Sequence, residues 1–319
     1  MTRGRWLGAG AVAILLALPI VLSSYALTVF IFIFFYAFLG QAWNILSGYG
    51  GQLSAGHAAF VGVGAYTSTK LALAYGLSPW IGMLLGGLAA ALLGAFIGYL
   101  GFRFGLRGFY FILLTVAVAE ICRLIALHVE ALGGALGLFI TFTGNPWMFQ
   151  FQDSRAHYYI ALALMLLATG VVAAMERSRM GAYLAAIKED EDAAEAVGVN
   201  TFRFKMLAIM LSAFLTGLGG TFYAYLIFSL QPAAVFGIPL SVDIIIRPVV
   251  GGAGTLMGPI LGSFILSPLA ELSRIYFAGG AWSGFHLVVY GALLIAVVLF
   301  LPQGAYPYVR RLLARPTRP

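Results

Sequence analysis

Residue types that usually carry catalysis are few in this chain and stand far apart. The four histidines occupy positions 57, 128, 157 and 286, and the single cysteine is Cys122. No helix face therefore carries two histidines at metal-ligand spacing, and no CxxC pair exists. Neither a GxSxG nor an HExxH sequence occurs. The sequence thus predicts neither a catalytic residue set nor a metal site, and it argues against an enzyme.

Polar residues that could bind a ligand gather at residues 48–60, GYGGQLSAGHAAF. Its glycines interrupt the helical pattern, and Ser54 is a suitable N-cap for a helix that starts again. Such a helix start within a membrane directs free N–H groups at its surroundings, and transporters hold carboxylates in this way. Gln52, Ser54 and His57 would add donors to a substrate site. An ordinary turn with a capping serine and a packed, neutral His57 explains the same residues.

Two acid–base pairs lie in otherwise apolar segments. Glu120 and Arg123 are three residues apart and Asp243 and Arg247 are four apart, so each pair shares one helix face. Charges inside membrane spans are costly and are usually paired. We expect Glu120 and Arg123 to neutralise each other within the helix bundle, with a substrate contact as the alternative. Arg247 could pair with Asp243 or face a transport pathway.

A glycine-rich sequence at 251–255, GGAGT, resembles part of a phosphate loop. It lacks the Gly-Lys-Ser/Thr that follows in such loops, and no parallel strand is expected before it. No Walker sequence occurs elsewhere in the chain. We therefore expect no nucleotide or other cofactor on this chain, so that any ATP must be hydrolysed by another protein.

The composition indicates a membrane protein. Of the 319 residues, 62% are hydrophobic and 9% are charged, and the mean hydropathy is +0.98, whereas soluble domains carry about 25% charged residues. Such a chain cannot cover a globule with polar surface, so its outer face must contact a lipid bilayer. The net charge of +7 does not indicate nucleic acid, because the basic residues stand at the ends of apolar segments. We expect one transmembrane domain over residues 1–319.

A span of about 20 apolar residues crosses a bilayer as a helix. The segment at 239–252 is short and could enter without crossing fully. The first segment could be a cleaved signal peptide, but we favour an uncleaved span because apolar residues continue after it. The expected fold is an all-α polytopic bundle, in which glycines such as Gly82, Gly86 and Gly94 let helices pack closely. We expect about ten spans, at 7–22, 26–46, 55–75, 80–101, 108–129, 157–175, 203–230, 239–252, 255–273 and 284–301.

Ten crossings place both termini on one side of the membrane, together with the loop at 176–205. Most lysines and arginines fall on that side. The preference for positive charge in cytoplasmic loops then makes the termini and this loop cytoplasmic, and the loop at 130–156 extracytoplasmic.

The 176–205 loop, ERSRMGAYLAAIKEDEDAAEAVGVNTFRFK, is dense in charge. Residues 183–197 contain no Pro or Gly and are rich in Ala, Glu and Lys, which predicts one helix. Tyr183, Ile187, Ala194 and Val197 would form a modest apolar stripe on it. Residues 188–195 carry one positive and five negative charges. This helix is either a solvated connection or a surface that contacts a partner.

Asp192, Ala193 and Ala194, followed by Gly198, resemble the EAA-x-x-x-G motif of ABC importer permeases, with Asp in place of Glu. In that family this cytoplasmic helix docks in a groove of the ATPase and transmits its motion. Two further stretches, GYGGQLSAGHAAFVGVGAYTS and VVGGAGTLMGPILGS, flank the loop in the family's order and spacing. From about residue 40 to about residue 300, the chain resembles the M-type permease subunit of branched-chain amino acid ABC importers.

This resemblance implies an importer-permease bundle in a bacterial plasma membrane that pairs with a homologous H-type permease. It also implies two cytoplasmic ABC ATPases, which bind ATP and Mg²⁺, and an extracytoplasmic substrate-binding protein. Asp192, Ala193, Ala194 and Gly198 would couple the permease to the ATPases. The substrate would be a branched-chain amino acid or, as in relatives, urea, a short amide or an aromatic acid. Arg247 and Pro248 stand where the family usually has apolar residues, and an arginine there could favour an anionic group, which leaves the substrate open.

Two other classes of protein remain as alternatives. An ion-coupled secondary transporter or channel would work without an ATPase and would use an intramembrane carboxylate, for which Glu120 is the candidate. A membrane enzyme is the second alternative, and it is disfavoured because no nucleophile or metal set was found.

Overall fold

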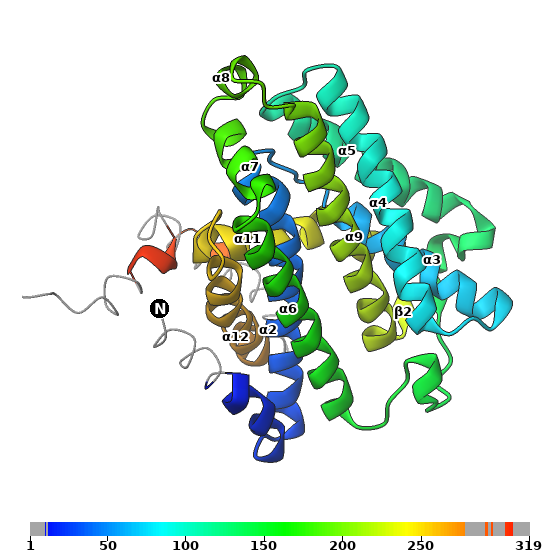
Figure 1. Cartoon of the computed structure of the whole chain (residues 1–319). Coiled ribbons are helices and arrows are strands. Elements are labelled where there is room, and N and C mark those ends of the chain that lie inside the picture. Colours follow the sequence, from blue (N-terminus) through cyan, green and yellow to red (C-terminus); the bar gives the residue numbers. More distant parts are fainter. Residues whose placement is uncertain (1–9, 11, 278–290, 293–294, 296–303, 309–319) are drawn as a thin grey trace, which may run out of the picture.

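Helices dominate the computed structural model, which describes residues 10, 12–277, 291–292, 295 and 304–308 (Figure 1). The long helices run side by side, and short elements connect them. The long helices are α2 (Ser24–Trp43), α3 (Ala58–Tyr75), α4 (Pro79–Arg103), α5 (Phe109–His128), α6 (Ser154–Glu176), α9 (Thr201–Ile227), α11 (Ile238–Gly251) and α12 (Gly258–Phe277). The short elements are η1 (Leu18–Ile20), η2 (Asn44–Tyr49), η3 (Glu130–Leu132), η4 (Gly134–Leu136), β1 (Leu138–Phe139), η5 (Pro146–Met148), α7 (Arg179–Glu189), α8 (Glu191–Ala196), β2 (Ser229–Leu230) and α10 (Pro232–Val235).

Six helices of the described part are long and apolar enough to cross a membrane. The expected all-α polytopic fold is therefore confirmed at this level. Helices α3 and α12 occupy two further expected spans but are not among the six. The expected span at 284–301 lies almost wholly outside the described residues, and the one at 7–22 lies partly outside them. The six are Ser24–Tyr49, Pro79–Arg103, Phe109–His128, Ser154–Glu176, Thr201–Ile227 and Pro232–Gly251.

Helices α3, α4 and α9 pack against one another through small residues. A Cβ at Gly82 would lie 2.5 Å from the Ser68 hydroxyl of α3, and one at Gly94 would lie 2.7 Å from the Cβ of Ala213 of α9. Gly86 faces the backbone of Gly64 just as closely. The predicted packing role of these α4 glycines is confirmed, and the close approach explains why larger residues are absent there.

A second group forms around α2, which packs against α6, α11 and α12. Its interior is aromatic, since Phe34, Phe35, Phe38 and Trp43 of α2 are fully or almost fully buried, as is Tyr158 of α6. The ring centroids of Phe34 and Tyr158 are 5.2 Å apart in an edge-on arrangement. Such rings bury large apolar areas and hold the two helices in a fixed orientation.

The two ends of the bundle differ in character. Helices α7 and α8 stand at the end where α9 begins, which we call the α8 end (Figure 1). At the opposite end, the loop between α5 and α6 is attached to the segment that follows α9 by the antiparallel pairing of β1 with β2. The charged loop and the 130–156 loop thus lie at different ends of the bundle, as the expected topology requires.

Candidate functional site

The break between α2 and α3 is built differently from the sequence expectation. Helix α2 continues into the π-helical turn η2, and α3 begins at Ala58 with His57 at its N-cap position. The prediction that Ser54 caps the new helix is therefore wrong. The first N–H of α3, that of Ala58, is instead donated over 3.0 Å to the Ser241 hydroxyl of α11. A side chain from a distant helix thus occupies one donor that a substrate carboxylate would need.

His57 is fully buried, and both its ring nitrogens have partners. Nε2 lies 2.9 Å from the Ser212 hydroxyl, which itself donates to the Ala42 carbonyl over 2.7 Å. Because the Ser212 proton is engaged, His57 Nε2 must be the donor, and Nδ1 then accepts from Ser54 Oγ at 3.0 Å. His57 is therefore a buried link between α2, the break and α9. Gln52 is half-buried, and its main-chain carbonyl accepts a hydrogen bond from Ser47 Oγ at 3.0 Å.

Arg247 lies inside the bundle, with a side chain only 2% exposed. Its Nη1 is 3.2 Å from a carboxylate oxygen of Asp243 and also contacts the Asp243 carbonyl. Its guanidinium lies 3.5 Å from the centroid of the Tyr36 ring on α2. The structure thus shows the pairing with Asp243, and a cation–π contact to the aromatic core stabilises the buried charge further.

The Glu120–Arg123 pair forms, but it does not lie within the bundle. Arg123 donates from Nη2 to Glu120 Oε1 at 2.6 Å and from Nε to Oε2 at 2.8 Å. The Arg123 side chain is 26% exposed and the Glu120 side chain is 47% exposed. The expected position inside the bundle is wrong because α5 packs against the rest of the chain through its opposite face. That face consists of Phe111, Thr115, Val118, Ala119 and Ala126.

The single helix expected at 183–197 is in fact two helices, α7 and α8, that meet at Asp190. Asp190 has an extended backbone, and its carboxylate accepts the Ala193 N–H at 3.0 Å. An aspartate before an acidic first turn is a strong helix-start signal, and it outweighs the helix propensity of the run. Helix α8 ends at Ala196, and Gly198, two residues later, has a φ of +89°, the left-handed conformation that glycine adopts without strain.

The apolar stripe of this element packs mostly inward. Ile187 and Ala194 are buried, and the Tyr183 ring packs on Phe204 of α9 with centroids 4.7 Å apart. Val197 is the exception, at 81% exposed. Of the residues that resemble the coupling motif, Asp192, Ala193 and Gly198 are exposed and Ala194 is buried. A partner at this end would therefore meet Val197 and the exposed turn rather than Ala194.

Two acidic residues of α8, Glu191 and Asp192, are held by two basic residues that the sequence analysis did not single out. Arg107, in the α4–α5 loop, lies 3.3 Å from Glu191 and 2.8 Å from Asp192. The hydrogen bond from Arg107 lowers the pKa of Asp192, so this pair persists at neutral pH and is lost only in acid. Lys205 of α9 is buried, contacts Glu191 and lies over the Phe102 ring.

We expect Lys205→Met to destabilise the chain by about 1–3 kcal/mol, because Glu191 then loses a partner in a poorly solvated position. The loss stays below that of a fully buried pair, since Arg107 still contacts Glu191. Thermal unfolding in detergent measures the change. Lys205→Met combined with Glu191→Gln removes the unpaired charge and should recover part of the stability. A double variant that is no more stable than the single one would contradict this account.

Lys188, near the end of α7, contacts both glycine-rich breaks at the α8 end. Its Nζ donates to the Gly48 carbonyl at 2.9 Å, and a Cβ on Gly254 would lie 3.2 Å from the same atom. The Asn44 side chain joins the two breaks, because it accepts from Gly254 N at 2.7 Å and donates to the Thr255 carbonyl at 3.0 Å. A cavity of about 340 Å³ lies beside Lys188, between η2 and α7. A movement of α7 would therefore displace the Lys188 contacts with both breaks, at Gly48 and at Gly254.

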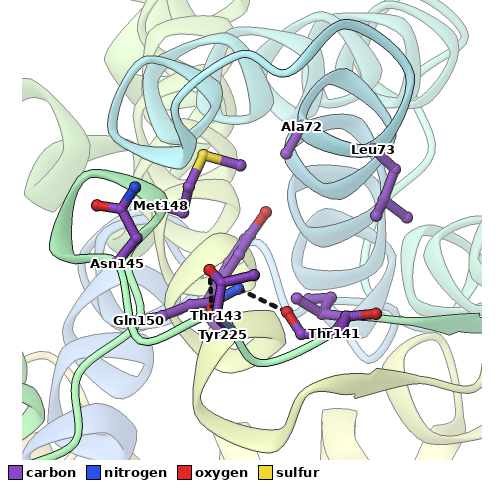
Figure 2. Close-up of a pocket in the computed structure, with 9 residues that line it drawn as sticks. Ala72, Leu73, Thr141, Thr143, Asn145, Met148, Gln150 and Tyr225 are labelled. Carbon is purple, nitrogen blue, oxygen red and sulfur yellow. Dashed lines mark hydrogen bonds between the residues drawn. The ribbon is translucent and has the colours of Figure 1, made fainter.

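A larger cavity, of about 490 Å³, opens at the opposite end of the bundle (Figure 2). The Gln150 side chain bridges its wall, since Nε2 donates to the Thr141 carbonyl at 3.0 Å and Oε1 accepts from Thr143 Oγ1 at 2.9 Å. The lining carries no charged side chain among its described residues. It consists of Ala72, Leu73, Ile140, Thr141, Thr143, Asn145, Met148, Gln150 and Tyr225.

Known proteins resemble this chain over most of its length. The family described as "Branched-chain amino acid transport system / permease component" matches residues 25–298. The high-affinity branched-chain amino acid transport system permease protein LivM of Salmonella typhimurium is 28% identical, over 93% of this chain and 73% of that protein. Its namesake from Escherichia coli is 29% identical, over 86% and 68%.

H-type relatives match as well. The permease protein LivH of Salmonella typhimurium is 27% identical, over 53% of this chain and 52% of that protein. No solved structure matches the chain significantly. Since the family match extends over residues 25–298 and the M-type relatives cover most of both chains, this chain belongs to the permease family of branched-chain amino acid transport systems and is of its M type.

Proposed function

We propose that this chain is the membrane permease subunit of an ATP-driven ABC importer. The observation that carries the proposal is the α7–α8 element. It projects from the end of a membrane bundle, exposes Val197 and acidic residues, and is attached to three parts of the bundle. The family, whose members are named as transport permeases, supports the same function.

The attachments of this element suggest how motion would pass into the bundle. Arg107 connects α8 to the α4–α5 loop, Lys205 connects it to α9, and Lys188 connects α7 to the breaks at Gly48 and Gly254. When two cytoplasmic ATPases close on ATP and Mg²⁺, a displacement of α8 would be carried to all three at once. Packed helices switch between discrete arrangements rather than deforming continuously, so such a push can open or close a pathway.

The proposed topology has about ten spans, with the α8 end and both termini in the cytoplasm. Basic residues concentrate at this end, as expected for cytoplasmic loops of a plasma membrane protein. Those that the structure describes there are Arg103, Arg107, Arg177, Arg179, Lys188, Arg203 and Lys205. The short α11 forms a 20-residue apolar stretch together with α10, Pro232–Gly251, which is enough for a crossing.

The proposed partners follow from the family. An H-type permease would complete the membrane part as a heterodimer, and an extracytoplasmic binding protein would deliver the substrate to the end that carries the β1–β2 pairing. The substrate class is branched-chain amino acids or related small amino acids, carboxylates or amides. An ion-coupled transporter that works alone is not favoured, because both carboxylate oxygens of Glu120 accept hydrogen bonds from Arg123.

Reconstitution tests the proposal. The chain is purified with a cognate H-type permease and two cognate ATPases, and uptake into proteoliposomes is measured with the loaded binding protein. We expect uptake that requires ATP and that disappears when the Walker lysine of the ATPases is replaced. Uptake that survives without the ATPases would favour the ion-coupled alternative. Failure of the chain to purify with any ATPase would overturn the proposal.

A further inference from the structure

The outward face of α5 is unusual for a helix of this bundle. Only 28% of its most apolar stretch is buried against the rest of the chain, the smallest share among the six candidate spans of the described part. Leu113, Ala117, Ile121 and Leu124 are exposed along this face, and Glu120 lies among them. An apolar face of this size on its own would simply contact lipid.

Lipid is an unfavourable surrounding for the ion pair on this face. At 1.5 Å per residue, Glu120 lies about 17 Å along the axis from Phe109, close to the middle of a hydrocarbon core of about 30 Å. Ionised groups at that depth face a bundle interior or water rather than lipid tails. Because this chain leaves the Glu120–Arg123 pair exposed, we expect another subunit or an aqueous pathway to adjoin it in the assembled transporter.

The chemistry of the pair points to a ligand. A free amino acid carries one ammonium and one carboxylate group, and it is expensive to bring into a low-dielectric site unless both charges are met. Glu120 supplies an acceptor for the ammonium, and Arg123 supplies a planar, two-pronged donor for the carboxylate. When the pair opens to admit such a ligand, four charges remain in balance. Neither urea nor an uncharged amide offers an equivalent exchange.

Other polar sites of the described bundle fit such a ligand less well. Both ring nitrogens of His57 are occupied, the cavity of Figure 2 has no charged side chain among its described lining residues, and Arg247 is enclosed with Asp243 and Tyr36. The Glu120–Arg123 pair combines both signs of charge with exposure at mid-membrane depth. Its apolar neighbours on α5 would receive the side chain of the ligand.

We propose that the exposed face of α5 lines the translocation pathway and that Glu120 and Arg123 bind the zwitterionic head group of an amino acid there. The proposal rests on the proposed transport function and narrows its substrate class, since it favours amino acids over urea and amides.

Cysteine accessibility tests the proposal in the assembled complex of both permeases and both ATPases. Cys122 is the single cysteine, so Cys122→Ala gives a cysteine-free background. Ala117→Cys then places a thiol one turn before Glu120 and leaves the ion pair intact. Leu92→Cys, on an outward part of α4 that is 70% exposed, is the matched lipid-facing control. A membrane-impermeant methanethiosulfonate should modify Cys at 117 about tenfold faster than at 92, since thiolates react only in water.

Protection by substrate tests the binding role. An equimolar mixture of L-alanine, L-leucine, L-phenylalanine and L-glutamine, delivered with the cognate binding protein, should slow modification at position 117. Urea and 4-methylpentanoate, which lack one or both charges, should not. Adding Glu120→Gln should abolish the protection and lower amino acid uptake about tenfold or more. The ammonium group of the ligand then has no carboxylate to bind, and a site that leaves a polar group of its ligand unpaired binds that ligand poorly.

Three results would overturn the inference. They are equal modification rates at 117 and 92, no protection by the amino acids, or normal uptake by the Glu120→Gln variant. Each can occur while the complex still assembles and hydrolyses ATP, in which case the permease function stands and only the site is wrong. The matched control for charge removal is Asp153→Asn with Arg155→Gln. In this exposed pair at the start of α6, Arg155 Nε lies 3.9 Å from Asp153 Oδ2. The pair lies at the end that the binding protein is proposed to approach, so the control is judged by the modification rate at position 117 without substrate, which should stay unchanged.

Discussion

Gly64→Leu is expected to prevent the α3–α4–α9 core from forming. A Cβ at Gly64 would lie 2.1 Å from the carbonyl oxygen of Gly217 on α9, and the Gly64 carbonyl is itself only 2.6 Å from where a Cβ on Gly86 would be. These neighbours are backbone atoms, which cannot rotate away as a side chain does. Relief therefore requires two helices to move apart, and we expect a loss of at least about 3 kcal/mol, at the upper limit of ordinary overpacking.

Gly170→Leu is the matched control for this substitution. Gly170 lies in the middle of α6 and has nothing within 4 Å of its ideal Cβ position. Because leucine favours helix over glycine by about 1 kcal/mol, this variant should be as stable as the wild type or slightly more so. Thermal unfolding and size-exclusion profiles in detergent compare the two. Equal damage from both substitutions would show that the close approach of α3 and α9 is not what limits stability.

The helical core could be predicted from sequence because it depends on local composition. Runs of apolar residues mark the spans, and the spacing of Gly82, Gly86 and Gly94 indicates a face of close packing. The two acid–base pairs were predictable for the same reason, since i,i+3 and i,i+4 neighbours share a helix face wherever the helix lies. Their spacing does not tell which way the face points, and so the outward position of Glu120 and Arg123 was missed.

The polar contacts that hold the breaks in place could not be predicted. Ser241 receives the first N–H of α3 from 183 residues away in sequence, and Asn44 binds Gly254 across 210 residues. Neither pairing can be recognised from the spacing of residues along the sequence, because only the folded bundle brings these residues together. Arg107 and Lys205 were overlooked likewise, as isolated basic residues at helix ends are expected from the membrane topology alone. By contrast, the helix start at Asp190 had a local signal, the acidic first turn that follows it.

Replacing Val197 by glutamate is expected to uncouple the permease from its ATPases and leave the bundle intact. Val197 is 81% exposed beside the charged turn of α8, so the change disturbs no internal packing. If this turn docks on an ATPase, as proposed, an apolar contact is lost and a carboxylate is buried without a partner. If the docking free energy is weakened by at least about 1.4 kcal/mol, the affinity for the ATPase falls at least tenfold. ATPase activity stimulated by the loaded binding protein, measured on the reconstituted complex, should fall by that factor or more.

Leu136→Glu provides the comparison. Leu136 is 77% exposed at the opposite end of the bundle, and the substitution adds the same negative charge there. Because the binding protein is proposed to approach that end, the readouts for this comparison are co-purification of the ATPases and the basal ATPase activity, and Leu136→Glu should leave both unchanged. Ala194→Trp is a weaker probe of docking, since Ala194 is 4% exposed and a large residue would displace α8 by itself. Val197→Thr, which keeps the shape of the side chain, should retain most of the coupling. If the complex with Val197→Glu showed the same stimulated ATPase activity as the wild-type complex, the ATPase would have to contact another surface at this end, and the role proposed for α8 would be wrong.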